Sequence, residues 1–141
     1  MFSDQYRAYD TLPREDRAFI EKRTVTHRVT GLDGIDGSAV HPLVRQHPIS
    51  GRKALYLSAP ARCVAVSGMA QDDAGEFVRY LVDHSTREDN LYRHPWAPGD
   101  VVMWDNRCVM HKADHSGVEG ARVMHRGMVA NQPESSMTGR P

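Results

Sequence analysis

The chain has 141 residues, a length typical of a single domain with a hydrophobic core of its own. Its 40% hydrophobic and 26% charged residues exclude a disordered or fibrous protein, and no apolar run approaches the roughly 20 residues of a membrane span. Lys plus Arg equals Asp plus Glu at 18 each, so we expect neither nucleic acid nor a membrane surface as a partner.

The first half of the chain is predicted to combine one helix with short strands. Pro13 favours the start of a helix over 13–22, because its fixed φ suits a first turn. Glu15 and Asp16 strengthen this prediction, because acidic side chains stabilise the positive end of the helix dipole. Alternating polarity and glycine content then predict a strand over 24–30, a loop over 31–37 and extended segments over 41–48 and 53–57.

The second half is predicted to begin with a helix and to continue mainly as strands. The helix covers 71–84, where apolar and aromatic side chains recur every three to four residues. A turn rich in Pro and Gly follows at 96–100. The remaining predicted elements are strands over 101–104, 107–111 and 122–130, and a tail from residue 132 whose Pro, Ser and Gly content favours flexibility.

The candidate chemistry lies in the last two predicted strands. His111 ends one strand and Arg122 opens the next, so neighbouring antiparallel strands could bring the imidazole and the guanidinium into one pocket. An imidazole can bind a metal ion, and a guanidinium can bind a carboxylate through two hydrogen bonds. Arg126 lies on the same face of an extended strand as Arg122, because side chains alternate along a strand. A metal beside a carboxylate clamp suggests an oxo-acid cosubstrate.

Other polar residues near this motif have simpler explanations. Asp105 more often makes hydrogen bonds within a turn than binds a metal. Asp114 and His115 lie in a polar, glycine-containing connection, where solvated side chains are the expectation. Cys63 and Cys108 are far apart and form no CxxC pattern, so we expect two free thiols in a reducing compartment.

Three segments carry a resemblance to a known family: HPLVRQHPISGRKALYL, HSTREDNLYRHPWAPGDVVMWDNRCVMH and RVMHRGMV. Together they resemble the C-terminal half of the TauD/TfdA family, the Fe(II)- and 2-oxoglutarate-dependent dioxygenases such as taurine dioxygenase. The resemblance covers a domain over 1–131 and leaves 132–141 as the flexible tail. It implies a mainly β fold with flanking helices (α+β), a partial double-stranded β-helix or jelly roll whose N-terminal strands are missing.

The resemblance also implies roles for individual residues. His111 matches the distal iron-binding histidine, Arg122 matches the arginine that clamps the far carboxylate of 2-oxoglutarate, and Arg126 matches the arginine that pairs with an anionic substrate. In the family an upstream HxD pair supplies the other iron ligands. None of the eight histidines here is followed two residues later by Asp or Glu. We therefore expect a family member that lacks about its first half.

Two functions follow as expectations. The first is a dioxygenase that uses Fe(II), 2-oxoglutarate and O2 to hydroxylate a small sulfonate or carboxylate, with taurine as the default. Such a chain would be inactive alone and would depend on a complementing N-terminal half or on assembly into a homo-oligomer. The alternative is a catalytically dead remnant or interaction domain without iron. We expect a cytoplasmic protein, because the N-terminus lacks the basic start and apolar core of a signal peptide.

Overall fold

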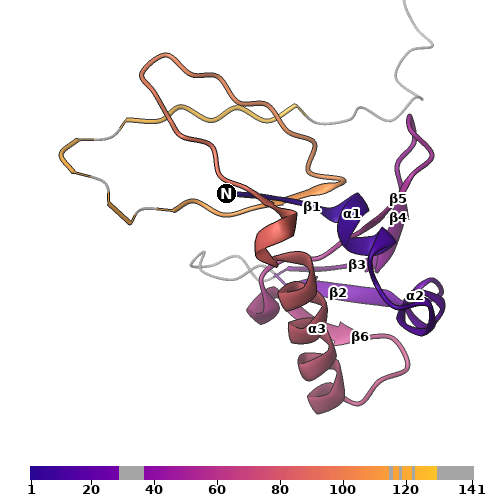
Figure 1. Cartoon of the computed structure of the whole chain (residues 1–141). Coiled ribbons are helices and arrows are strands. Elements are labelled where there is room, and N and C mark those ends of the chain that lie inside the picture. Colours follow the sequence, from indigo (N-terminus) through magenta and orange to yellow (C-terminus); the bar gives the residue numbers. More distant parts are fainter. Residues whose placement is uncertain (29–36, 115, 118, 122, 130–141) are drawn as a thin grey trace, which may run out of the picture.

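The computed structural model of the chain describes residues 1–28, 37–114, 116–117, 119–121 and 123–129. Within these ranges the helices are α1 (Gln5–Asp10), α2 (Arg14–Ile20) and α3 (Gln71–Ser85), with short 3-10 turns at Pro60–Arg62 and Glu88–Asn90. The strands are β1 (Phe2–Asp4), β2 (Thr24–Arg28), β3 (Ser38–Pro42), β4 (Val44–Gln46), β5 (Lys53–Leu55), β6 (Cys63–Val66), β7 (Leu91–Tyr92) and β8 (Val109–His111). Figure 1 shows their arrangement. None of the helices in the described part is long and apolar enough to cross a membrane.

Local signals in the sequence account for the helices. The predictions over 13–22 and 71–84 are confirmed by α2 and α3, each of which has two acidic residues in its first turn. The short helix α1 begins at Asp4, whose side chain accepts hydrogen bonds from the backbone N–H groups of Tyr6 at 2.9 Å and Arg7 at 3.2 Å. This N-cap carries β1 directly into α1, an element that the sequence analysis did not predict.

The strands form three small antiparallel sheets with the orders β7-β1-β8, β3-β2-β6 and β4-β5. In the first sheet the central strand β1 places Phe2 opposite Tyr92 on one side and opposite His111 on the other. The predicted strand over 24–30 and the extended segments over 41–48 and 53–57 correspond to β2, to parts of β3 and β4, and to β5. Most of the loop predicted over 31–37 lies outside the described residues.

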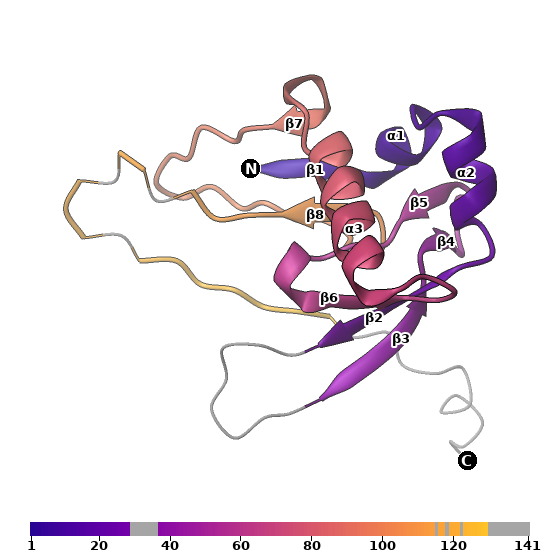
Figure 2. The same ribbon diagram turned by 90° about the horizontal axis from the view of Figure 1, so that it is seen from below.

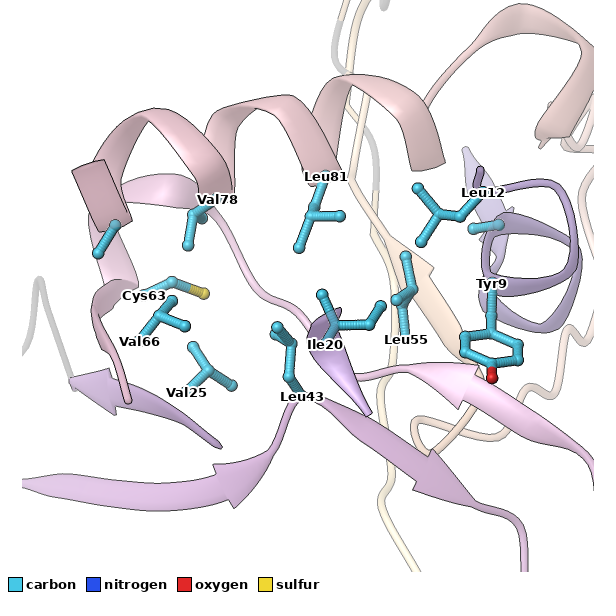
Figure 3. Packing of buried hydrophobic residues seen from close by; sticks show 12 residues of the cluster. Tyr9, Leu12, Ile20, Val25, Leu43, Leu55, Cys63, Val66, Val78 and Leu81 are labelled. Atoms are coloured by element: carbon cyan, nitrogen blue, oxygen red, sulfur yellow. The ribbon is translucent and has the colours of Figure 1, made fainter. Parts of the chain in front are cut away.

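The hydrophobic core lies between α3 and the second and third sheets. Figure 3 shows Val78 and Leu81 extending from α3 toward the side chains of Val25, Leu43 and Ile20. These five side chains are almost completely inaccessible to solvent. Every member of the core cluster lies between residues 8 and 81. The first sheet, which carries His111, therefore lies beside the main core and contributes no residue to it.

Two long segments of the second half do not form the predicted strands. Residues 93–108 form a long excursion that connects β7 to β8, and the described residues of 112–129 continue beyond β8 on the same side of the first sheet (Figures 1 and 2). The prediction of strands over 101–104 and 122–130 is therefore not met in the described part of these ranges, and only 109–111 of the segment 107–111 is strand. A strand requires a neighbour for its backbone N–H and C=O groups. These segments have no such neighbour among the described residues.

Candidate functional site

The site begins with His111, the last residue of β8. Pairing of β8 with β1 brings His111 opposite Phe2, at the start of the chain. The indole of Trp104 packs against the imidazole with 4.8 Å between ring centroids, and it also contacts Phe2 at 5.2 Å. His111 is nevertheless exposed. The ring is thus supported on one side by aromatic residues and open to a ligand on the other.

Two positive charges act on this imidazole. Partial desolvation lowers the pKa of His111 below its ordinary value, and the charges of Arg126 and of the N-terminal amino group lower the pKa further. The amino group of Met1 is held in place by donating a hydrogen bond to the carbonyl oxygen of Lys112 at 3.0 Å. A neutral imidazole is the form that binds a metal ion, so the lowered pKa extends the pH range over which His111 can act as a ligand.

Of the two predicted anion-binding arginines, the structure describes one. Arg126 lies in the exposed segment 123–129, where its guanidinium donates to the sulfur of Met128 at 3.5 Å. The salt bridges between described residues do not include Arg126, so its charge is available for an anionic ligand. Arg122 lies outside the described residues, and its role as the 2-oxoglutarate clamp stays a prediction.

A second group of ligand-type side chains lies at the turn before β8. One ligand atom from each of His47, Asp105 and Cys108 falls within 4.8 Å of the others. The Asp105 carboxylate, however, accepts hydrogen bonds from the Arg107 backbone N–H at 2.8 Å and from its Nε at 2.9 Å and Nη2 at 2.5 Å. These bonds hold the pKa of Asp105 far below its usual range, and His47 adds a weaker contribution. Because the guanidinium already occupies the carboxylate and would repel a cation, this group is structural.

The role of His47 is to join two distant parts of the chain. Its Nδ1 accepts from the backbone N–H groups of Ile49 at 3.3 Å and Ser50 at 3.2 Å, so Nε2 carries the proton and donates it to Asp105 at 3.0 Å. The loop between β4 and β5 is thereby attached to the turn that leads into β8. The turn role predicted for Asp105 agrees with these contacts. Its partner His47, 58 residues away, could not be found from local sequence.

The described residues do not make a complete iron centre around His111. Only the structural group of His47, Asp105 and Cys108 brings three metal-type ligands together in this part of the chain. A non-haem Fe(II) site requires two histidines and a carboxylate on one face, and a single imidazole has little affinity for the ion. His111 fits one ligand position, and the remaining ligands have to come from other residues. Cys63 and Cys108 are both free thiols, as expected.

The family and several relatives of the chain were identified by comparison with known proteins. The profile described as "Taurine catabolism dioxygenase TauD, TfdA family" matches residues 1–128. The (S)-phenoxypropionate/alpha-ketoglutarate-dioxygenase of Delftia acidovorans is 32% identical over 152 residues, which is 95% of this chain and 51% of the relative. The alpha-ketoglutarate-dependent 2,4-dichlorophenoxyacetate dioxygenase of Cupriavidus pinatubonensis is 34% identical over 138 residues, which is 89% of this chain and 47% of the relative.

Solved structures agree with these sequence relationships. The crystal structure of AAD-2 in complex with Mn(II) and N-oxalylglycine superposes with a TM-score of 0.71 at 32% identity, covering 82% of this chain and 51% of that one. A taurine dioxygenase from Burkholderia xenovorans gives a TM-score of 0.70 at 31% identity, covering 77% of this chain and 37% of that one. The prediction of part of a jelly roll with flanking helices is thereby confirmed. The chain spans about half the length of the curated relatives it matches, and it belongs to the TauD/TfdA family of 2-oxoglutarate-dependent dioxygenases.

Proposed function

We propose that this chain contributes one side of the active site of an Fe(II)- and 2-oxoglutarate-dependent dioxygenase that oxidises a small organic anion. His111 is the proposed iron ligand, Arg122 the proposed partner of 2-oxoglutarate and Arg126 the proposed partner of the substrate anion. The observation that carries the proposal is the exposed imidazole at the end of β8, supported by Trp104 and close enough to Arg126 for the two groups to interact electrostatically.

The residues have complementary tasks in this proposal. The lowered pKa of His111 favours its neutral form, in which a ring nitrogen presents a lone pair to the metal, while Trp104 restricts the orientation of the ring. Arg126 supplies a planar cation whose N–H groups match the oxygens of a carboxylate or sulfonate. Its charge also favours entry of an anion over entry of a neutral molecule of similar size.

The names of the relatives support an anionic substrate and widen the choice. They include enzymes named for phenoxypropionate and 2,4-dichlorophenoxyacetate, which are carboxylates, and one named for a sulfate ester. We therefore keep the proposed class of small sulfonates and carboxylates, with aryloxyalkanoates as candidate carboxylates, and extend it to sulfate esters. A panel that contains one member of each class, with a neutral analogue of the same size, tests this proposal.

We expect the chain to need a complementing half before it turns over, because the described residues offer one ligand position around His111. The same observation favours an iron-free interaction domain as a second candidate function. Succinate release with Fe(II), ascorbate and 2-oxoglutarate distinguishes the two. The bare chain is expected to release none, and robust turnover by it would contradict the need for a complementing half.

The sharper test joins residues 1–131 to the part of the Delftia acidovorans enzyme that the chain does not match. We expect this chimera to release succinate with at least one member of the substrate panel, and His111→Ala to abolish the release. His125→Ala is the matched control, because His125 is an exposed histidine of the neighbouring segment with no proposed role. Full turnover by the His111→Ala chimera would refute the proposed ligand.

A further inference from the structure

Two strands of the second sheet bring a histidine and a cysteine together. His27 of β2 and Cys63 of β6 are direct partners in the antiparallel pairing. The register of the two strands shifts between Thr26 and His27, and without this shift His27 would lie opposite Val64. Directly opposite side chains project from the same face of a sheet, so the shift places an imidazole beside a thiol. Irregularities of this kind commonly redirect a side chain at a functional site.

A serine completes the group. Ser58 follows β5, and its hydroxyl oxygen lies 3.0 Å from Nδ1 of His27 and 3.4 Å from the sulfur of Cys63. The remaining distance, from Nδ1 to the sulfur, is 3.9 Å. Cys63 is only 4% exposed, and its thiol also donates to the carbonyl oxygen of Ser58 at 3.7 Å. Three segments of the chain thus bring a nitrogen, an oxygen and a sulfur atom within 3.9 Å of one another.

The distances in this group suit one tetrahedral zinc ion. Zn–S bonds of about 2.3 Å and Zn–N bonds of about 2.0 Å, set at a tetrahedral angle, separate the two ligand atoms by roughly 3.5 Å. The separation between Nδ1 of His27 and the sulfur of Cys63 is 3.9 Å, so both atoms can bind the same ion after a movement of roughly 0.4 Å. Thiolate sulfur and imidazole nitrogen are also the ligand types that zinc prefers.

The protonation of His27 favours metal binding as well. Burial and then the charge of His41 lower the pKa of His27 below its ordinary value, which extends the pH range of the neutral ring. A neutral imidazole keeps the lone pair that a metal ion requires.

This group differs from the one formed by His47, Asp105 and Cys108. There the guanidinium of Arg107 occupies the carboxylate of Asp105 and would repel a cation. The side chains of His27, Ser58 and Cys63 are instead hydrogen-bonded to one another. An ion that enters this group replaces contacts within it and breaks no ion pair between described residues.

We propose that Cys63, His27 and Ser58 form a binding site for a thiophilic divalent cation of the zinc type, with water completing the tetrahedral shell. On binding, the S–H bond of Cys63 breaks, a sulfur–metal bond forms and the proton passes to the solvent, with no change of oxidation state. The ion joins β2, β6 and the segment after β5, and so stabilises the second sheet. The proposal is independent of the proposed function, because none of these residues belongs to the site around His111.

Cobalt(II) is the probe for this site, because it replaces zinc and gives a sulfur-to-cobalt charge-transfer band when a thiolate binds it. Added without oxygen to the untagged, reduced 141-residue chain, a single equivalent of Co2+ should produce this band, and Zn2+ should displace Co2+ and remove it. Calorimetry of Zn2+ binding in buffers with different ionisation enthalpies should record the release of the thiol proton. Absence of the band would overturn the proposal.

Variants identify the ligands. Cys63→Ser should abolish the charge-transfer band, and His27→Gln should weaken Co2+ binding. Cys108→Ser is the matched control and should keep the band, because Cys108 is also a buried free thiol beside a histidine. A band that survives in Cys63→Ser and disappears in Cys108→Ser would assign the ion to the other group and overturn the proposal. If circular dichroism shows that Cys63→Ser is unfolded, His27→Gln decides, and unchanged Co2+ affinity in that variant would overturn the proposal.

Binding at His111 is distinguished by the same measurement. An imidazole without a thiolate gives no sulfur-to-cobalt band, so His111→Ala should leave the band unchanged. Loss of the band in His111→Ala would contradict the assignment to Cys63. Succinate release by a complemented enzyme tests the proposed function alone, because the cobalt measurement uses neither Fe(II) nor 2-oxoglutarate.

Discussion

The contact between His47 and Asp105 makes the strongest prediction about how the site is held. Asp105→Asn keeps the shape of the side chain but removes its charge, and it replaces one acceptor oxygen with an N–H2 group. In the native protein the carboxylate accepts from three Arg107 donors and from His47 Nε2. The His47 side chain is only 10% exposed, so its N–H group has little access to water as a replacement partner.

The size of the effect follows from these contacts. A hydrogen bond to a charged group contributes about 1.5–3 kcal/mol to stability. Asp105 is one-third exposed, and the bonds to Arg107 are local, so solvent screening reduces their share. We therefore expect Asp105→Asn to lower the free energy of unfolding by about 2 kcal/mol, most of it from the bond to His47.

Urea unfolding followed by circular dichroism measures this loss. The matched control is Asp114→Asn, because Asp114 is exposed and its hydrogen bonds to described residues all come from nearby Ser116, so the change in stability should stay within about 0.5 kcal/mol. A double-mutant cycle with His47→Ala should give a coupling of about 1 kcal/mol or more, since the two residues are in direct contact. Equal effects of the two Asp→Asn changes, or a coupling near zero, would refute the assignment of Asp105 as the anchor of the β8 turn.

Three further changes test the fold itself. Leu81→Ala should lower the free energy of unfolding by about 2–5 kcal/mol, because Leu81 is fully buried on the core-facing side of α3. A loss below about 1 kcal/mol in urea unfolding would contradict this packing. Asp4→Ala should cost about 1 kcal/mol through loss of the α1 cap, whereas Asp4→Asn should cost much less. Burial and then the charge of His41 lower the pKa of His27, so the unfolded chain binds more protons and stability should fall as the pH drops below about 6.5. His27→Gln should reduce this loss of stability at low pH, measured as the free energy of unfolding in urea titrations at several pH values. An unchanged dependence of stability on pH would contradict the role of His27.

The helices could be predicted from the sequence because their signals are local. Pro13 with two acidic residues marks the start of α2, and the three-to-four spacing marks α3. This spacing does not by itself identify the buried face of α3, because Ala74 and Val78 are buried whereas the aromatic Tyr80 is exposed. Helix periodicity gives the face only approximately, since several side chains border both core and solvent.

The elements that escaped prediction depend on contacts between distant residues. Three residues are too few for an alternating pattern, and β1 exists because β7 and β8 pair with it from the other end of the chain. The support of the site is equally non-local, since Phe2 and Trp104 pack together beside His111. The family motif could therefore indicate His111 as a ligand, but not the aromatic residues that hold its ring.

The strand predicted at 101–104 is absent from the structure, although its sequence is typical of a buried strand. Val102 and Trp104 are half-buried, whereas Val101 and Met103 are almost fully exposed. Burial therefore alternates along the segment as in a strand, and the side chains of one face are exposed to solvent. A strand intended to face water on one side would carry polar residues there, and four consecutive apolar residues are typical of a strand covered on both sides. The sequence of this segment therefore matches an environment that the described residues do not supply.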